Sequence, residues 1–523
     1  MEQMLTWLLI VPLAGAVIGM LLKGDSAPRV WALVVSVLSA GLAAGLIVAF
    51  NFNDAAAVQF PVAPAFLQLD EIGFKFSLGI DSISLWLVAL TAVLMPLAIG
   101  SSWESIKLRP KEFYAWMLLL QFAMLGVFCA RDLLLFYVFF ELTLIPMFFI
   151  IGIWGGRDRQ RAAVKFFLFT FSASVLTLAG VILLGLHAGA AGGASFDIND
   201  VVRYGQSIAP AARFWVFLAL LAGFAVKVPL FPLHTWLPLA HTEAPTAGSV
   251  ILAGVLLKLG TYGLMRLAIP IGMPDVVPQL AGLLGALCLI GIVYGALVAW
   301  VQTDIKKLVA YSSVSHLGFC VLGLVAMNAT GVQGSVFYMI NHGISTGALF
   351  LMVGMIYDRY HTREIDKLSG LAKRMPWLAF FFVLFAMSSV GLPGTNGFAS
   401  EFLTILGAFT SPHLGVAYGA IAAIGIVLGA VYMLHLVQSV MFGPLKTPIH
   451  AEQGDDAATP GDLNWREIAI LAPLAVVVIV LGVAPNIVLK TIEAPVAKLL
   501  LLPASTVVAA PANVERVAVG VAR

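Results

Sequence analysis

Four charged residues lie in or beside stretches of this sequence that are otherwise apolar and long enough to cross a membrane. They are Glu141 within 133–153, Lys227 after 214–225, Lys258 within 250–264, and Glu401 after a break at 391–397. A charge inside the hydrocarbon is costly and usually faces a water-lined interior, where it marks a path for ions or protons. These residues therefore predict a machine that moves charge across a membrane.

The composition predicts a polytopic membrane protein. Of the 523 residues, 61% are hydrophobic and 11% are charged, and the mean hydropathy is +0.99. Such a chain would expose large apolar surfaces if it folded in water. Apolar runs of about 18 to 25 residues, the length that crosses about 30 Å of hydrocarbon, predict fourteen helices. They cover residues 4–22, 28–50, 80–101, 113–129, 133–154, 164–187, 212–233, 246–268, 278–300, 306–327, 332–356, 376–409, 413–442 and 467–489.

Prolines and glycines interrupt the seventh and the twelfth predicted helices. The first break contains Pro229 and Pro232, and the second contains Pro393, Gly394 and Gly397. An ordinary kinked helix would explain either break alone. The breaks are five helices apart and each lies beside a charge, as in transporters built from inverted repeats. The pattern favours an all-α fold with two inverted five-helix repeats, helices 4–8 and 9–13.

Four regions are expected along the chain. They are a three-helix region at 1–110, the first repeat at 111–270, the second repeat at 271–442, and an inner loop, last helix and tail at 443–523.

The basic residues predict the orientation in the membrane. With the N-terminus outside, the inner connections, to which Lys306 and Lys307 are assigned, carry 18 basic residues. The outer connections carry only five, which are Lys75, Arg131, Arg203, Arg213 and Arg266. Because positive charge collects on the cytoplasmic side, this bias places both termini outside.

Long motifs around the buried charges resemble one protein family. The motifs are Phe139–Pro146, Lys227–Ser249, Leu256–Gly260 and Asp304–Ser313. They resemble the antiporter-like subunits of proton-pumping NADH:quinone oxidoreductase, respiratory complex I, over helices four to thirteen. Within that family, the segment Leu392–Phe402 is similar to the branch called subunit M, or chain 4, whereas the sister subunits L and N carry lysine in place of Glu401. Multisubunit sodium/proton antiporters and membrane-bound hydrogenase-type complexes are the alternative.

The resemblance implies that this chain translocates protons through its buried charges. Glu141 is then the counter-charge of Lys227: the closed pair favours the ammonium, and separation lets the lysine release its proton toward Lys258. Glu401 is the last acceptor before release. A static buried ion pair that only supports assembly is the other interpretation of Glu141 and Lys227.

Several histidines lie between or beside these charges. An imidazole titrates near cellular pH, so His316 and His342 are candidate proton relays. Each could instead be a hydrogen-bonded helix contact. His234 and His241 border the first break, where they either line an inner proton entrance or cap loops, and His435 is a candidate for the outer exit.

Redox chemistry is expected elsewhere in the complex. The sequence contains no dinucleotide-binding fingerprint, P-loop or flavin motif. Cys129, Cys288 and Cys320 lie in apolar helices without ligand spacing, so no metal site is predicted. We therefore expect no cofactor in this chain, flavin and iron–sulfur clusters in partner subunits, and no catalysis by the isolated chain.

The resemblance also implies partners and a location. We expect contacts with other membrane-arm subunits, especially L and N, and with lipid, but not with nucleic acid. Quinone and NADH are reached only through the assembled complex, in the bacterial cytoplasmic (inner) membrane. A structural spacer, in which the charges are replaceable, is a third hypothesis. We further predict that Glu141, Lys227, Lys258, His316 and Glu401 face inward near the bilayer midplane and form one row.

Overall fold

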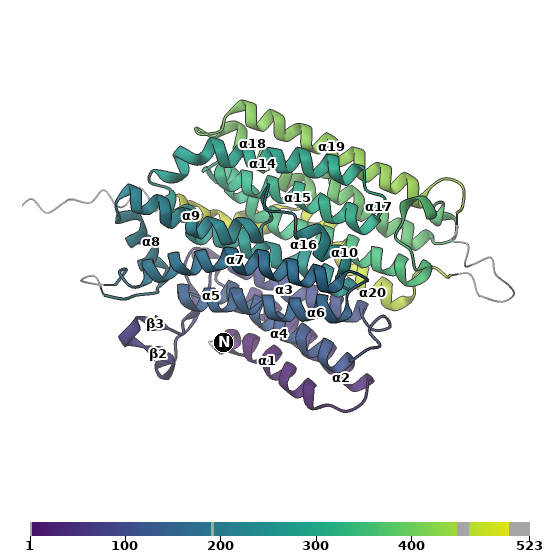
Figure 1. Ribbon diagram of the computed structural model, residues 1–523, viewed down its shortest axis with the longest axis horizontal. Coiled ribbons are helices and arrows are strands. Elements are labelled where there is room, and N and C mark those ends of the chain that lie inside the picture. Colours follow the sequence, from purple (N-terminus) through teal and green to yellow (C-terminus); the bar gives the residue numbers. More distant parts are fainter. Residues whose placement is uncertain (1–2, 190–192, 447–459, 502–523) are drawn as a thin grey trace, which may run out of the picture.

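Long apolar helices lie side by side through most of the molecule (Figure 1). The computed structural model describes residues 3–189, 193–446 and 460–501. Within these ranges, 13 helices are long and apolar enough to cross a membrane. They are α1 (Met4–Leu21), α2 (Ser26–Ala49), α3 (Ser82–Ser101), α4 (Pro110–Cys129), α5 with α6 (Leu133–Trp154), α7 (Arg159–Gly185), α9 (Pro210–Lys227), α11 to α13 (Thr246–Gly272), α14 (Val276–Trp300), α15 (Ile305–Val325), α16 (Ala329–Tyr360), α19 (Val416–Met441) and α20 (Trp465–Val483).

The twelfth predicted helix is present as two halves, which completes the expected fourteen. The first half, α17 (Pro376–Val390), ends at Gly391, and the second half is α18 (Asn396–Thr410). Gly391 has a φ of 78°, the left-handed conformation with which glycine commonly ends a helix. Its N–H donates to the Ser388 carbonyl at 3.2 Å. The sequence therefore breaks this helix where the glycines predicted.

The seventh predicted helix is also broken, but earlier than its expected end at residue 233. Helix α9 stops at Lys227, and α10 (Leu237–Glu243) follows after a non-helical segment. Prolines in that segment have no N–H to continue the helix. The indole Nε1 of Trp236 donates to the Val226 carbonyl at 2.9 Å, which satisfies a carbonyl at the end of α9.

Two further irregularities were not predicted. Helices α5 (Leu133–Leu142) and α6 (Leu144–Trp154) meet at Thr143. The eighth span contains two π-helical segments between its α-helical parts α11 (Thr246–Ile251), α12 (Leu257–Gly263) and α13 (Ile269–Gly272). They are Leu252–Leu256 and Leu264–Ala268. Because π turns are rare and often mark functional sites, it is notable that α12 carries Lys258.

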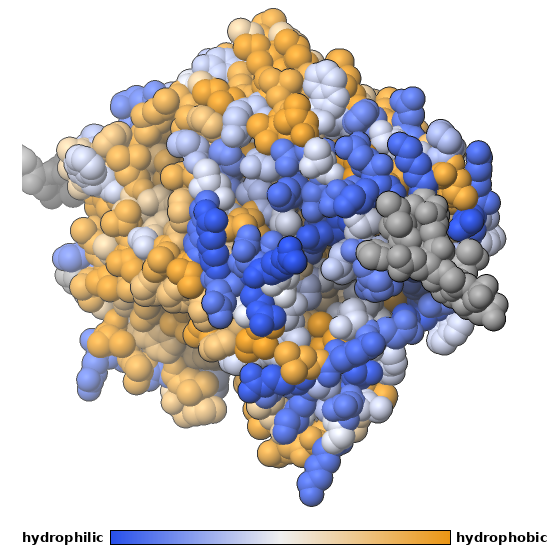
Figure 2. Space-filling view, turned by 45° about the vertical axis from the view of Figure 1, so that its right-hand side comes forward, coloured by the Kyte–Doolittle hydropathy of each residue, from blue (hydrophilic) through white to orange (hydrophobic). Residues whose placement is uncertain are grey.

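The helices in the centre of the bundle are buried on all sides. The most apolar window of α16 is 100% buried, against 33% for α7. The outer helices instead present apolar side chains to the surroundings, and Figure 2 shows them on the flank of the molecule, with hydrophilic residues gathered at one end. An apolar flank between polar ends is the surface expected of a membrane protein.

Short strands and two extra helices depart from the expected all-helical pattern. Strand β1 (Gln59–Val62) pairs with β4 (Leu78–Ile80), and β2 (Gln68–Leu69) pairs with β3 (Phe74–Lys75), both antiparallel. Helix α8 (Ile198–Ser207) precedes α9, and α21 (Asn486–Leu501) follows α20. The last predicted helix, 467–489, thus ends early at Val483. Parts of the predicted region 443–523, namely 447–459 and 502–523, lie outside the described residues.

Candidate functional site

Lys258 begins a row of buried polar side chains that passes from helix to helix. It lies in α12 between the two π-helical segments and is fully buried. Its Nζ donates to the carbonyl of Ala253, within the first π segment, and lies 2.7 Å from Nδ1 of His342 on α16. The π segment thus supplies a carbonyl partner for the lysine, and His342 is the next member of the row.

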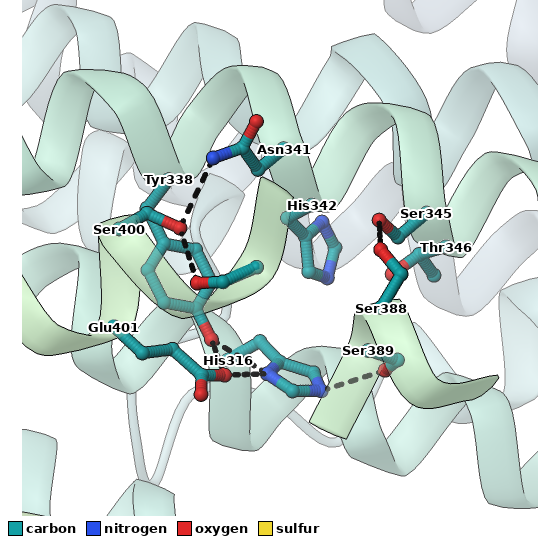
Figure 3. A pocket seen from close by; sticks show the side chains of 11 residues that line it. His316, Tyr338, Asn341, His342, Ser345, Thr346, Ser388, Ser389, Ser400 and Glu401 are labelled. Carbon is teal, nitrogen blue, oxygen red and sulfur yellow. Dashed lines mark hydrogen bonds and ion pairs between the residues drawn. The ribbon is translucent and has the colours of Figure 1, made fainter. Parts of the chain in front are cut away.

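His342 and His316 connect the lysine to the second half of the protein. Their ring centroids are 5.7 Å apart, one on α16 and the other on α15. Nε2 of His342 is buried and, among the described residues, has no hydrogen-bond partner. Nδ1 of His316 lies 2.7 Å from the hydroxyl of Tyr338, and its Nε2 lies 3.2 Å from that of Tyr432 and 3.3 Å from that of Ser389. His316 therefore has polar contacts on both sides of its ring (Figure 3).

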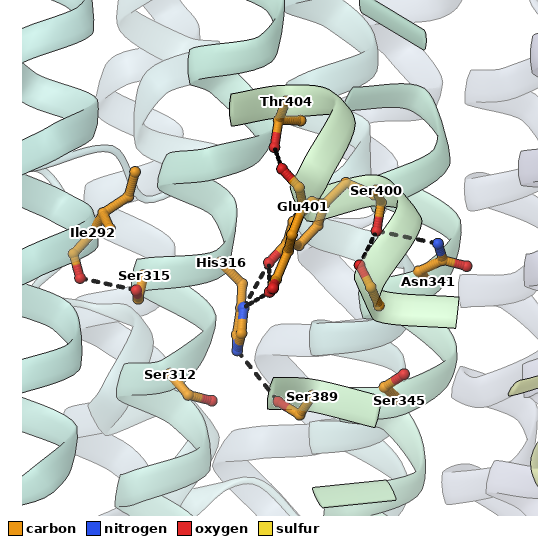
Figure 4. A network of polar contacts seen from close by, with 12 residues as sticks. Ile292, Ser312, Ser315, His316, Asn341, Ser345, Ser389, Ser400, Glu401 and Thr404 are labelled. Atoms are coloured by element: carbon orange, nitrogen blue, oxygen red, sulfur yellow. Dashed lines mark hydrogen bonds and ion pairs between the residues drawn. The ribbon is translucent and has the colours of Figure 1, made fainter. Parts of the chain in front are cut away.

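Glu401 ends the row just after the second break. It is buried in α18, and its Oε1 accepts a hydrogen bond from the Tyr338 hydroxyl at 2.7 Å. The same oxygen lies 3.5 Å from Nδ1 of His316 (Figure 4). Tyr338 thus bridges the imidazole and the carboxylate, which gives a proton two routes between them.

The second break is held by side chains beside this row. Asn341 donates to the Asn396 carbonyl at 2.7 Å, Ser388 donates to Oδ1 of Asn396 at 2.5 Å, and the Ser345 and Ser388 hydroxyls are 2.6 Å apart. These contacts satisfy polar groups at the point where the helix is interrupted. A cavity of ≈ 10 Å³ between them and the row has room for about one water molecule.

Lys227 and Glu141 lie near the first break, and they are not joined by an ion pair. Lys227, the last residue of α9, donates to the Thr143 hydroxyl at 3.1 Å, and its Nζ lies 4.7 Å from the centre of the Phe140 ring. In the described part of the chain no ion pair links Lys227 to Glu141, whose Oε1 is buried without a hydrogen bond. Because Thr143 offers the lysine a nearby hydroxyl, the structure has the pair in an open arrangement.

The remaining candidate histidines differ in placement. His241 in α10 is fully buried, and its ring stacks on Phe350 with centroids 4.7 Å apart. His234 is also buried, between Phe231 and Tyr294. Neither side chain caps a backbone group among the described residues, so the loop-cap interpretation finds no support. His435 is exposed on α19, so the structure does not bring it into the buried row.

Sequence reasoning missed three residues of this region. Tyr338 lies four residues before His342 on an apolar helix, and this spacing places both side chains on one face. That spacing was the only indication in the sequence that Tyr338 belongs to the site. Thr143 gave no signal. Lys306, assigned to an inner connection, is buried, and its Nζ donates at 2.5 Å to the carbonyl of Ala244, the residue that follows α10. Lys306 therefore ties α15 to the helix that follows the first break.

The described residues do not form a metal-ligating cluster. No group of three or more His, Cys, Asp or Glu side chains in the described ranges is placed to hold a metal ion. The three cysteines are free and buried. The described site therefore consists of proton-exchanging and hydroxyl side chains.

Comparisons with known proteins cover nearly the whole chain. A family model described as "NADH:quinone oxidoreductase/Mrp antiporter, TM" matches residues 130–423, and one described as "NADH-ubiquinone oxidoreductase chain 4, amino terminus" matches residues 27–129. NADH-quinone oxidoreductase subunit M of Rhodobacter capsulatus is 42% identical over 95% of this chain and 96% of its own length. NADH-ubiquinone oxidoreductase chain 4 of Arabidopsis thaliana is 39% identical over 95% of this chain and 96% of its own length.

Solved structures share the fold. A chain of respiratory complex I from Thermus thermophilus with bound NADH matches with a TM-score of 0.83 and 30% identity, over 95% of this chain and 99% of that chain. A chain of the Mrp complex from Dietzia sp. DQ12-45-1b matches with a TM-score of 0.82, over 97% of this chain and 98% of that one. Its identity of 22% supports a likeness of fold alone.

Proposed function

Because the chain belongs to the NADH:quinone oxidoreductase chain 4 family of antiporter-like membrane subunits, we propose that it translocates protons in the membrane arm of such an oxidoreductase. The observation that carries this proposal is the row from Lys258 through His342 and His316 to Glu401. Each member lies inside a membrane-length bundle and is buried. Hydrogen-bond contacts join Lys258 to His342 and His316 through Tyr338 to Glu401, and the two imidazole rings between them are 5.7 Å apart, so groups that exchange protons follow one another across four helices, which a static scaffold does not require.

Proton transfer along this row uses both nitrogens of His342 and Nδ1 of His316. His342 receives a proton from the Lys258 ammonium at Nδ1, because that contact is 2.7 Å, and releases one from Nε2. Nε2 has no other partner among the described residues, so it is free to face His316 or a water. His316 then passes a proton through Tyr338 or directly to Glu401, at 2.7 and 3.5 Å. Proton transfer requires such short heavy-atom distances.

Glu141 and Lys227 act as the gate of the first half. In the open arrangement Thr143 holds the ammonium, and Glu141 carries a buried carboxylate oxygen without a hydrogen bond. An unpaired buried polar group is costly, which favours closing, whereas the Thr143 hydroxyl stabilises the separated ammonium, so the two arrangements lie close in free energy. Closure and opening therefore couple the protonation of Lys227 to a small movement at the junction of α5 and α6.

The rest of the assembly supplies the driving reaction. Flavin and iron–sulfur clusters reside in partner subunits, quinone and NADH are met only through the complex, and the sister subunits L and N are direct neighbours. The family membership supports these assignments. The two breaks, five helices apart, support an inverted repeat of helices 4–8 and 9–13.

The protein is placed in the bacterial cytoplasmic membrane with both termini outside. The bias of basic residues toward one set of connections supports this orientation.

The test replaces Lys258 by methionine, which keeps the length of the apolar side chain but cannot carry a proton. Inverted membrane vesicles that contain the assembled complex are given NADH, and proton uptake is followed with a fluorescent pH-gradient probe. We expect uptake to fall on the order of tenfold or more, equal to at least about 1.4 kcal/mol of barrier. Lys307→Met, an exposed lysine on α15, is the matched control. Normal uptake by assembled Lys258→Met would remove the row from the pathway.

A stand-alone cation/proton antiporter is the alternative function. The fold that this chain shares with a chain of the Mrp complex is the observation behind this alternative. The proteins that copurify with the tagged chain decide between the two, since only the oxidoreductase includes subunits that oxidise NADH.

A further inference from the structure

A cavity of ≈ 590 Å³ is lined by residues of α8 and α21, among others. Its volume is in the range of about 300–1,000 Å³ that small-molecule sites occupy. Its wall is built from the connection before α3, the start of α5, helix α8, the end of the eighth span, and α21. It is separate from the row of proton-exchanging residues, since none of them lines it.

The wall of this cavity carries an excess of positive charge. Its cations are Arg131, Arg203, Arg266 and Lys498, and its one carboxylate is Asp81. Arg266 forms an ion pair with Asp81. Burial raises the pKa of Asp81, but Arg266, the Ser84 N–H and Arg131 together outweigh this effect and hold the pKa below its ordinary value, so Asp81 is ionised and compensates mainly Arg266.

The other three cations are less well neutralised. Arg203 pairs with Asp200 at 3.3 Å, and that ion pair is exposed and therefore weak. Lys498 donates only to the carbonyl of Ala56, at 3.3 Å. Within the described residues neither Arg131 nor Lys498 forms an ion pair. A cleft lined by charges of one sign concentrates ions of the opposite sign.

The positive charge on the predicted outer side of the protein is concentrated at this cavity. Only five basic residues are predicted near the outer connections between the first and last spans, and three of them, Arg131, Arg203 and Arg266, line this one cavity. Lys498 joins them from α21. Arg131, Arg203 and Lys498 lie outside the membrane-length spans, and Arg266 is near the end of one. This is the level at which lipid phosphates lie.

Apolar residues complete the wall. Val58, Val202, Pro495 and Leu499 face the same cavity as the cations. An inorganic anion gains nothing from such a surface, whereas an amphiphile buries its glycerol and upper acyl carbons against it. We propose that this cavity binds the phosphate-bearing headgroup of an anionic lipid, with Arg131 and Lys498 as its main charged contacts.

The experiment uses the intact complex in nanodiscs of zwitterionic lipid doped with a photo-crosslinkable phosphatidylglycerol. After irradiation, labelled peptides are identified by mass spectrometry. We expect label on the segments of α8 and α21 that line the cavity, and roughly tenfold less label in the double variant Arg131→Gln/Lys498→Gln, because each cation near the surface contributes to binding of anionic lipid. The control, Arg157→Gln/Lys490→Gln, removes two exposed charges outside the cavity and should label as the unaltered complex does.

A competition experiment and a second variant, to be used if the double variant does not assemble, complete the test. Unlabelled phosphatidylglycerol should compete for the site, whereas inorganic phosphate in large excess should not. If the double variant fails to assemble, Lys498→Gln alone, on the last described helix, should still reduce labelling several-fold. Equal labelling of variant and control, full competition by inorganic phosphate, or crosslinks from the cavity to a neighbouring subunit in place of lipid would each overturn the proposal.

Discussion

The two breaks in the bundle differ in how completely the polar groups around them are paired. Around the second break, Glu401 accepts from Tyr338, His316 has contacts at both ring nitrogens, and Asn341 and Asn396 satisfy the interrupted backbone. Around the first break, Glu141 keeps a buried oxygen without a hydrogen bond among the described residues, and Lys227 contacts only a hydroxyl and a ring face.

This difference indicates different tasks for the two regions. Around the second break only Nε2 of His342 lacks a partner among the described residues, and a network that is otherwise paired holds its members in one geometry. A buried charge without its partner has a second arrangement close in free energy, as a switch requires. We interpret the second region as a conductor of protons and the first as the gate that controls it.

The largest expected effect comes from a substitution in the gate formed by Glu141 and Lys227. Glu141→Gln should lower coupled NADH:quinone turnover on the order of tenfold or more, because Lys227 loses its counter-charge while helix packing is kept. Glu141→Asp keeps the charge at shorter reach and should be milder. Turnover is measured in membranes with assembly checked by native gel. The control is Glu112→Gln, at a surface ion pair. A normal proton yield in assembled Glu141→Gln would show that Glu141 is not part of a gate.

A similar loss should follow at the far end of the conductor. Glu401→Ala should lower proton uptake by about tenfold, because the row loses its last acceptor. Glu401→Lys should preserve more uptake if any protonatable group in that place serves. Uptake per NADH oxidised is the measurement. Two equally inactive but assembled variants would show that the negative charge itself is required, and full activity of Glu401→Ala would exclude the residue from the path.

An intermediate effect is expected at Tyr338, which bridges His316 and Glu401. Tyr338→Phe removes the hydroxyl between His316 and Glu401 but keeps the ring, and the direct contact of 3.5 Å remains. We expect a fall of about threefold to fivefold, less than for a lost charge, since a neutral hydrogen bond contributes about 1 kcal/mol. The matched control is Tyr418→Phe, whose hydroxyl donates to the Gly282 carbonyl away from the row. A loss as large as that of Glu401→Ala would make Tyr338 an obligatory carrier.

The smallest effect is expected at Thr143, which accepts the hydrogen bond of Lys227 in the open arrangement of the gate. Thr143→Val keeps the shape of the side chain but removes the acceptor of Lys227, which favours closure onto Glu141. We expect about a twofold change in turnover, since one hydrogen bond shifts the gate only modestly. Thr170→Val is the control, because that hydroxyl donates only to carbonyls of its own helix. If Thr143→Val equals Glu141→Gln, the threonine is part of the path and not a holder of the open state.

The predictable parts of this fold follow from local chemistry. Pro229, Pro232 and Gly391 act on their own backbone, so both breaks were visible in the sequence. Lys258 and Glu401 were visible because a charge in an apolar run has few explanations other than a buried path. The length of apolar runs likewise gave the number of spans.

The unpredicted parts depend on contacts between distant segments. Tyr338 bridges His316 and Glu401 only because α15, α16 and α18 meet, which no local pattern specifies. The π turns beside Lys258 replace one helical hydrogen-bond register by another; the first contains Gly254, but a single glycine in an apolar run does not specify a π turn. The burial of Lys306 was not predicted because its charge suggested an inner connection, whereas the Ala244 carbonyl offers it a buried partner.

The course of the row has an electrical consequence. It passes between neighbouring helices near the middle of each, from Lys258 in the eighth span to His342 in α16 and His316 in α15. On the proposed path, a proton that moves sideways along the row crosses little of the membrane thickness, so it does almost no work against the transmembrane voltage, which costs about 2.3 kcal/mol per elementary charge per 100 mV across the full thickness. The voltage therefore acts on the steps that load and empty the row, and transfer within the row proceeds at nearly constant electrical potential.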